Sequence, residues 1–573
     1  MKRLFKEHEI RTTIDLNGSW RFITDPEKKG EEYGWQAKLP SEAKTVIIPS
    51  LWNNELGMLN YTGQAWYEKQ FKTQGGTLRL EFGSVMTEAD VWLDGKYLGN
   101  HYGAFTQFEF IVNGIEAGEH TLVVRADTTK DKKSFPQEYT DWHNYGGIAR
   151  DVEAQELKGI TILSNHIVYE LSDDFKNATL HAELEVYNAD SQEASSELSV
   201  TVGDFTIYNG NVTLKAGEKQ AIKTADYEVK DVKIWDPATP NLYTVVAKTK
   251  TDDLIDRVGF RRIETRGNDI YLNGKSILLL GVNRHEEHPE WGFAFPPKLM
   301  RKDLDIIRDL GCNTIRGSHY PNSRIFMDML DEDGMLFWCE IPMWGVGFGK
   351  DVLADPDVSG RGFNMIKEMA KYYYNHPSII IWGMHNEVDT RLDVVYEFTK
   401  AYRAHLKEFG GNRLLTHASN VPFEDKCMEL DDIISMNLYK GWYSGSVEDW
   451  DKFVIEFKEH LEKIGVYGRP VLMSEFGAGA LYGYHSAFDT LRWSEEFQRD
   501  LLEHCLELFL NCEYMRGTYI WQFCNIRTSP TLDLNRVRCF NNKGILDEYR
   551  NPKAAYFKVK EIYEKYGKKG TSC

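Results

Sequence analysis

The chain has 573 residues, more than one hydrophobic core supports, so we expect two to four domains rather than a single small binding module. Hydrophobic residues make up 42% and charged residues 27% of the chain, which excludes a disordered or fibrous protein. The 68 basic and 87 acidic residues give a formal charge of −19, and no basic stretch is long enough to follow a phosphate backbone, so we expect no nucleic-acid partner.

Residues 1–157 contain short segments in which apolar and polar residues alternate. Examples are TLRLEFGSV at 77–85, ADVWLDGKYLG at 89–99 and HTLVVRADT at 120–128. This alternation is typical of antiparallel strands, and the Asp94-Gly95 pair is typical of a hairpin turn. The pattern predicts a β-sandwich.

Residues 158–258 continue with alternating segments. They include ATLHAELEVYNA, SSELSVTVGD and YTVVAKTKT, and the region has the size of an immunoglobulin-like sandwich. It contains no cysteine and no cluster of candidate catalytic residues. We interpret it as a support domain.

From residue 259 to 573, apolar runs alternate with amphipathic helical stretches. The eight candidate strands are SILLLGV, CNTIRG, LFWCEI, IIIWGM, LLTHAS, IISMNL, PVLMSE and TYIWQF. Predicted helices lie between them, at 297–311 and at 494–512 with Ser494 as the capping residue. Eight such units predict a (β/α)8 TIM barrel, whose chemistry takes place at the carboxyl ends of the strands.

Polar residues at these strand ends are the candidate site. They are Asn283, Arg284, His285, Arg316, Ser318, His319, Glu340, His385, Asn386, Glu387, His417, Asn437, Tyr439, Ser474, Glu475, Trp521 and Gln522. Glu387 and Glu475 each directly follow an apolar run, and a barrel brings them together. Paired carboxylates hydrolyse glycosidic bonds, with retention at roughly 5 Å separation and inversion at wider separation. The other reading is that each carboxylate forms a structural ion pair.

Other chemistries have weaker support. His285 and His288 are three residues apart, whereas a helical zinc motif needs four, and neither a CxxC pair nor a GxSxG elbow is present, so no metal is predicted. No apolar run reaches 18 residues, so we expect no membrane partner. We interpret the cysteines as reduced thiols of a cytoplasmic protein; they are Cys312, Cys339, Cys427, Cys505, Cys512, Cys524, Cys539 and Cys573.

Over nearly its full length the chain resembles glycoside hydrolase family 2, and within it the bacterial β-glucuronidases of the gut-microbe type. The motifs that carry the resemblance occur in family order: LNGSWRF, DWHNYGGIAR, GVNRHEEHP, IRGSHYPN, NHPSIIIWGMHNEV, NLYKGWY, SEFGAGALYG and FNNKG. The resemblance implies a jelly-roll-like sugar-binding sandwich, an immunoglobulin-like sandwich and a TIM-barrel catalytic domain, and a role in carbohydrate metabolism.

The resemblance also assigns roles at the site. It implies that Glu387 in HNEV is the general acid/base and that Glu475 in SEFG is the nucleophile, with retention of the β configuration. Asn386 matches a residue that holds the 2-hydroxyl. The remaining residues that it implies for sugar binding are Asp141, His285, Tyr439 and Trp521.

A glucuronide substrate is implied by one short segment, Asn541-Asn542-Lys543-Gly544. In family members that act on glucuronides, an Asn-x-Lys motif binds the sugar carboxylate, here through Asn541 and Lys543, and Tyr443 would add a third donor. An ammonium and an amide on an anion give charge-assisted hydrogen bonds worth roughly 1.5 to 3 kcal/mol each. The net charge of −19 does not oppose this, because salt screens charges beyond about 8 Å.

Some features leave other readings open. Val388 stands where the family usually has proline, and two motifs are shared with β-galactosidases, so a β-galactosidase or β-galacturonidase is the first alternative. A catalytically silent sugar-binding protein is the second. The segment 344–362 is short, which predicts an open leaving-group site. Arg536 and Arg538 could also contact the sugar carboxylate.

We expect catalysis without a cofactor, on a small-molecule or oligosaccharide glucuronide. The sequence neither predicts nor forbids an accessory surface ligand such as flavin mononucleotide (FMN). The resemblance implies a homo-oligomer, a dimer or a tetramer.

Overall fold

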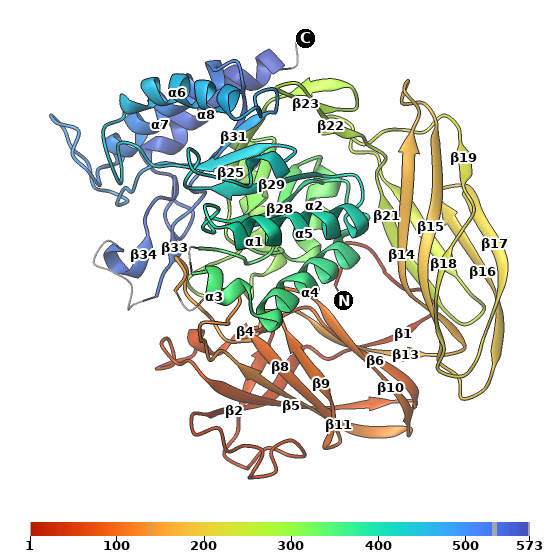
Figure 1. The fold of residues 1–573 in the computed structure, drawn as a ribbon. Helices are drawn as coiled ribbons and strands as arrows, with labels where there is room; N and C mark the ends of the chain where they lie inside the picture. The colour runs from red at the N-terminus through yellow and green to blue at the C-terminus, as the bar shows by residue number, and fades with distance from the viewer. Residues whose placement is uncertain (1, 138, 346, 530–535, 571–573) are drawn as a thin grey trace.

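The computed structural model describes residues 2–570 except 138, 346 and 530–535. The chain forms two β-sandwiches and a closed eight-stranded barrel (Figure 1), which confirms the predicted fold class. Seven of the cysteines are described and all are free, whereas Cys573 lies outside the described residues. Among the described residues, no helix has the length and apolar character needed to cross a membrane.

The first sandwich contains a six-stranded sheet, a four-stranded sheet and a small three-stranded sheet, in the orders β3-β2-β5-β11-β8-β9, β1-β13-β6-β10 and β4-β12-β7. Their strands are β1 (Thr12–Asp15), β2 (Gly18–Asp25), β3 (Lys44–Ile48), β4 (Ser50–Leu51), β5 (Gln64–Thr73), β6 (Gly76–Phe82), β7 (Val85–Met86), β8 (Glu88–Leu93), β9 (Lys96–Tyr102), β10 (Phe108–Ile115), β11 (Gly118–Asp127), β12 (Gly147–Ile148) and β13 (Val152–Leu157). A short 3-10 helix, η1 (Trp52–Asn54), follows β4.

The predicted hairpin of the first sandwich is confirmed. Asp94 and Gly95 connect β8 to β9, and both have positive φ angles, 50° and 78°. Such a turn requires φ above zero at both central residues, which glycine and aspartate tolerate. Alternate residues of the strands point inward and form the sandwich core.

The second sandwich pairs two antiparallel sheets. One has the order β14-β15-β18, with β19 also on β15, and the other has the order β17-β16-β20-β21. The strands are β14 (Ile160–Leu171), β15 (Ala178–Asn188), β16 (Ala194–Val202), β17 (Phe205–Leu214), β18 (Lys219–Lys223), β19 (Tyr227–Val229), β20 (Tyr243–Lys248) and β21 (Asp253–Val258). Its core consists of small and branched apolar side chains, and no residue of this domain lines the cavity described below.

All eight predicted strands of the barrel are confirmed. They are parallel and follow one another in chain order: β25 (Leu279–Asn283), β26 (Thr314–Gly317), β27 (Leu336–Glu340), β28 (Ile379–Asn386), β29 (Leu414–Ser419), β30 (Ile434–Asn437), β31 (Val471–Phe476) and β32 (Met515–Ile520). The last strand ends before Trp521, which the sequence had placed within it. Almost every residue of these strands is buried, as expected for parallel strands covered on both faces.

The helices cover the outside of the barrel (Figure 1). They are α1 (Pro297–Asp309), α2 (Arg324–Asp333), α3 (Lys350–Leu353), α4 (Pro356–Tyr373), α5 (Asp393–Phe409), α6 (Asp449–Lys463), α7 (Glu495–Asn511) and α8 (Ala554–Gly570), with 3-10 turns η2 (Met428–Leu430) and η3 (Val537–Cys539). The predicted cap is confirmed, because the Ser494 hydroxyl accepts a hydrogen bond from Phe497 N at 3.2 Å. A small sheet of β22 (Ile263–Arg266), β23 (Asp269–Leu272) and β24 (Lys275–Ile277) packs with Trp235 against the amino-terminal end of the barrel.

The first sandwich is firmly attached to the barrel mouth. Trp142 and Tyr145 share an apolar cluster with the barrel residues Phe293 and Tyr320. The Tyr145 hydroxyl also donates to Glu287 at 2.6 Å. The loop between β11 and β12 is therefore held beside the carboxyl ends of the barrel strands, where β33 (Ile526–Arg527) and β34 (Phe540–Asn541) also pair.

Candidate active site

A cavity of about 840 Å³ opens at the carboxyl ends of the barrel strands. Its walls come from the β11–β12 loop of the first sandwich and from loops that follow the barrel strands. The lining residues are Gln137, Tyr139, Thr140, Asp141, Trp142, His319, Trp344, Gly345, Gly347, Glu387, Asn420, Asn437, Leu438, Tyr439, Tyr443, Ser444, Glu475, Trp521, Arg536 and Lys543. Both carboxylates predicted from the sequence are among them.

Glu387 is the first residue after β28. Its φ angle of 52° lies in the left-handed region, which is unfavourable for a side chain larger than that of glycine and typical of functional positions. The backbone is held by a hydrogen bond from Glu387 N to Ala418 O at 2.8 Å. Asn437 Nδ2 donates to the carboxylate at 3.0 Å. Burial raises the pKa of Glu387 above its ordinary value, which favours the protonated acid.

Glu475, within β31, has stronger partners. Arg316 Nη1 donates to one carboxylate oxygen at 2.9 Å, and the Tyr439 hydroxyl donates to the other at 2.7 Å. Burial and the nearby Glu387 carboxylate raise the pKa of Glu475 to about 8, against the opposing effects of Arg316 and Tyr439. The two raised pKa values mean that the pair retains a proton. The direct hydrogen bond from Arg316 to Glu475 is the reason to place that proton on Glu387 and the negative charge on Glu475.

Arg316 connects the second carboxylate to the rest of the site. Besides Glu475, it donates to Asn386 Oδ1 at 2.6 Å and to both oxygens of Glu340 at 3.0 and 3.1 Å. Asn437 Nδ2 also donates to Asn386 Oδ1, at 2.8 Å. The two carboxylates therefore lie within one buried hydrogen-bonded network that fixes their orientation.

Lys543 lies at another wall of the cavity. Its ammonium donates to the Tyr443 hydroxyl at 2.6 Å, and it is 4.8 Å from the centre of the Tyr443 ring. The residue is only 3% exposed, and no described carboxylate comes within ion-pair distance of its Nζ. A buried ammonium that lines a cavity and has no carboxylate of the described chain as its partner can bind the anionic group of a ligand there.

Asp141 and Asn541 meet beside Lys543. Asp141 accepts two hydrogen bonds from Arg536, both at 2.7 Å, and one from Asn541 Nδ2, also at 2.7 Å. Arg536 also approaches the Tyr443 hydroxyl, at 3.4 Å. Arg536 thus lies on the cavity wall, whereas Arg538 pairs with Glu548 and does not line it.

Aromatic rings form another part of the wall. Trp521 stacks on His319, with ring centres 5.1 Å apart, and the edge of His285 meets Trp521 at 5.5 Å. His285 lies behind the lining residues, and its Nδ1 is 3.1 Å from the Tyr320 hydroxyl. Burial lowers the pKa of His285 well below its ordinary value, so the ring is neutral.

The sequence had placed Arg316 and Asn437 at strand ends without giving them roles, and both contact the carboxylates directly. It gave no individual role to Trp142, Trp344 or Asn420, which also line the cavity. Trp142 could have been found, because it is adjacent to Asp141 in the same motif. Trp344 and Asn420 lie in loops after β27 and β29, where the sequence gives no signal of their direction.

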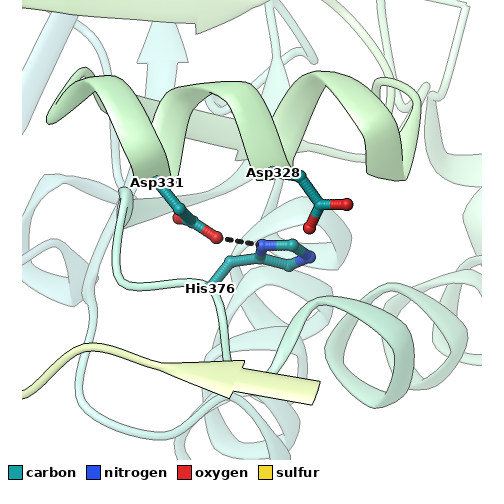
Figure 2. A group of neighbouring side chains, drawn as sticks. All are labelled: Asp328, Asp331 and His376. Atoms are coloured by element: carbon teal, nitrogen blue, oxygen red, sulfur yellow. Dashed lines mark hydrogen bonds and ion pairs between the residues drawn. The ribbon is translucent and has the colours of Figure 1, made fainter. Parts of the chain in front are cut away.

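Outside the cavity, three buried side chains have the composition of a metal site. Asp328 and Asp331 lie on α2 and face His376 (Figure 2). His376 contacts Asp331, and Arg3 donates to both oxygens of Asp328 at 2.8 and 2.9 Å. Asp328 is thus paired with the Arg3 guanidinium and Asp331 with the His376 ring, so we interpret the group as a structural network of ion pairs and hydrogen bonds.

Three family models match successive parts of the chain. They are described as "Glycosyl hydrolases family 2, sugar binding domain" over residues 13–157, "Glycosyl hydrolases family 2" over residues 160–261 and "Glycosyl hydrolases family 2, TIM barrel domain" over residues 263–567. Together they cover almost the whole chain in the order of the observed domains.

The chain is similar to several individual proteins. A solved β-galacturonidase from Eisenbergiella tayi, bound to galacturonate, has 35% sequence identity and a TM-score of 0.91, with 99% of each chain covered. A β-glucuronidase from Ruminococcus gnavus in complex with D-glucaro 1,5-lactone has 25% identity and a TM-score of 0.86, covering 98% of this chain and 99% of that one. The β-glucuronidase of Streptococcus agalactiae is 27% identical over 97% of this chain and 96% of its own.

Proposed function

Because the chain belongs to glycosyl hydrolase family 2, we propose that it is a retaining β-glucuronidase, which hydrolyses β-D-glucuronides to glucuronate and an aglycone. The observation that carries the proposal is the buried Lys543 ammonium, which lies in the same cavity as Glu387 and Glu475 and has no carboxylate of the described chain as its partner. The sugar carboxylate would supply that partner. β-Glucuronidases among the relatives support the same substrate.

The proposed reaction is a double displacement. Glu387, protonated, donates its proton to the glycosidic oxygen while the Glu475 carboxylate attacks the anomeric carbon, and the aglycone leaves. Glu387, now ionised, removes a proton from water, and the water oxygen displaces Glu475 from the sugar. The hydrogen bonds of Arg316 and Tyr439 favour the ionised form of Glu475, which the attack requires. No cofactor takes part in these steps.

The direct test compares chromogenic β-glucuronide, β-galacturonide and β-galactoside substrates side by side. We expect the highest kcat/KM for the glucuronide, because Lys543 pairs with a carboxylate that the galactoside lacks. Proton NMR should show the β-anomer of glucuronate as the first product. A galactoside with the highest kcat/KM would contradict the proposal, and absence of turnover on all three would favour a silent sugar-binding protein.

A β-galacturonidase is the second candidate function. It is favoured by the 35% identity and the TM-score of 0.91 to the Eisenbergiella tayi enzyme. Glucuronate and galacturonate share the carboxylate and differ in configuration at the 4-hydroxyl, so Lys543 would serve both. Asp141 and Arg536 also face the cavity and could contact that hydroxyl. In the same assay, a higher kcat/KM for the galacturonide would establish this candidate.

Glu387→Gln should separate the two carboxylate roles. We expect a loss of roughly 10²- to 10⁴-fold in kcat on phenyl glucuronide, whose leaving group needs a proton, and a smaller loss in the first step on p-nitrophenyl glucuronide. Because burial raises the pKa of Glu387, wild-type activity should fall as pH rises through that pKa, and the variant should lose this alkaline decline. If the rate of the first step fell equally on both substrates, and the variant still lost activity at alkaline pH as the wild type does, the assignment would be contradicted.

We place the protein in a reducing cytoplasm, a proposal supported by the seven described cysteines, which are all free. We also propose that it acts as a dimer or a tetramer, as family resemblance implies. Analytical ultracentrifugation of the purified protein measures this oligomeric state directly.

A further inference from the structure

Lys553 is a fully buried lysine that takes no part in the proposed reaction. It lies directly before α8 and is 0% exposed. Its Nζ contacts four oxygen atoms: Ala480 O and Gly544 O, both at 2.7 Å, Asn525 Oδ1 at 2.9 Å and Asn542 O at 3.1 Å. One ammonium therefore holds oxygens from three separate segments of the chain.

These three segments all continue into the active site. Ala480 follows β31, which contains Glu475, and Asn525 follows β32 and Trp521. Asn542 and Gly544 are the two immediate neighbours of Lys543. Lys553 thus contacts the backbone on both sides of the residue to which we assign carboxylate binding.

The contacts demand a charged donor. An ammonium has three N–H groups, and four oxygens around it leave no room for a lone pair. None of the four contacting oxygens belongs to a carboxylate, although the nearby carboxylates of Glu495, Glu548 and Asp547 also favour the charged form. Burial lowers the pKa of Lys553 to about 7. An apolar side chain here would leave buried carbonyl oxygens with fewer partners.

The backbone around Lys543 and Gly544 has little freedom to change its conformation locally. A Cβ at Gly544 would lie 2.2 Å from Asn525 N and 2.4 Å from Leu546 O, so the backbone is packed as closely as glycine allows. Gln522 N donates to Lys543 O at 3.1 Å, and Gln498 Nε2 donates to Gly544 O at 3.1 Å. If the Asn542 and Gly544 carbonyls around Lys553 shifted, Lys543 between them would therefore shift together with them.

We propose that Lys553 is a positioning residue that sets the place of the Lys543 ammonium and thereby the affinity for a uronate carboxylate. The inference rests on the proposed function, because it assumes that Lys543 binds that group. Lys553 itself does not touch the substrate. Its loss should affect the binding of the sugar acid more than bond cleavage, since Glu387 and Glu475 are held by Arg316 and Asn437 instead.

The test uses Lys553→Gln, which keeps two N–H donors without the charge, and Lys553→Met, which keeps neither. Lys565→Met is the matched control, because Lys565 lies on α8, the helix that directly follows Lys553, and is half exposed. Thermal unfolding and near-ultraviolet circular dichroism establish that each variant is folded. Kinetics on p-nitrophenyl glucuronide are then measured in the wild-type and in the Lys543→Ala background.

We expect Lys553→Gln to raise KM for the glucuronide roughly 10- to 100-fold with kcat changed by less than about threefold, since a displacement of about 1 Å costs about 10²-fold. In the Lys543→Ala background, the same substitution should lower kcat/KM by less than about twofold further, because residues that act through one another are not additive. Lys565→Met should behave as wild type.

Three outcomes would overturn the inference. They are an unchanged KM in folded Lys553→Gln, a full additional loss in the Lys543→Ala background, and loss of the fold in both Lys553 variants, which would make Lys553 a residue of general stability. If Lys543→Ala alone left glucuronide kinetics unchanged, the carboxylate assignment of the proposed function would fail as well. If Lys543→Ala lowered kcat/KM for the glucuronide as expected and Lys553→Gln left the glucuronide kinetics unchanged, only the positioning role of Lys553 would be refuted.

Discussion

Glu475→Gln should abolish turnover, with a loss in kcat of at least about 10⁴-fold, because an amide cannot form the covalent bond to the sugar. The substitution is nearly isosteric, and the Gln side chain can still accept a hydrogen bond from Arg316 or Tyr439. The fold should therefore persist. Activity on p-nitrophenyl glucuronide, measured together with the thermal unfolding temperature, checks both expectations.

Glu459→Gln is the matched control for this variant. Glu459 lies on α6, is exposed and is remote from the cavity lining, so its substitution should leave kcat unchanged. A Glu475→Gln protein that retains full activity would show that another group is the nucleophile. An inactive protein that has also lost its thermal transition would leave a folding defect as the explanation instead.

Lys543→Ala should reduce kcat/KM for the glucuronide by roughly several hundredfold. Charge-assisted hydrogen bonds contribute about 1.5 to 3 kcal/mol each, and the variant also removes the contact between Lys543 and the Tyr443 hydroxyl. Any activity on a neutral β-galactoside should change little, because that substrate has no carboxylate. The ratio of the two kcat/KM values is the measurement.

Lys452→Ala controls for the loss of a positive charge elsewhere. Lys452 is an exposed lysine on α6, and its removal should leave the ratio unchanged. If Lys543→Ala lowered kcat/KM equally on the glucuronide and the galactoside, Lys543 would stabilise the site in general and would not bind the sugar carboxylate specifically. In that case Arg536, the other cation on the cavity wall, becomes the candidate.

The fold could be predicted from the sequence because each domain has its own periodicity. Alternation in ADVWLDGKYLG specified a hairpin, and the continuous apolar run IIIWGM specified a strand buried on both faces. The boundary of the last barrel strand was less well predicted. The apolar and aromatic run from Tyr519 continues past Ile520 to Trp521, so nothing in it marks Ile520 as the last residue of β32.

The site could be predicted only in part. Glu387, Glu475 and Lys543 lie within recognisable motifs, and all three line one cavity in the structure. The hydrogen-bond partner of each of these side chains could not be predicted from the sequence. That Arg536 pairs with Asp141, 395 residues away, and that Arg316 reaches Glu475 and Asn386, depend on side-chain directions that a pattern of residue types does not contain.

The β11–β12 loop has a consequence for how this enzyme can diversify. Gln137, Tyr139 and Trp142 belong to the first sandwich, yet they line the same cavity as Glu387 and Glu475 of the barrel. Residues that line the cavity together with Glu387 and Glu475 are thus encoded hundreds of residues away from them in the sequence. Changes in the loop can alter which conjugates are accepted while the machinery of cleavage is inherited intact.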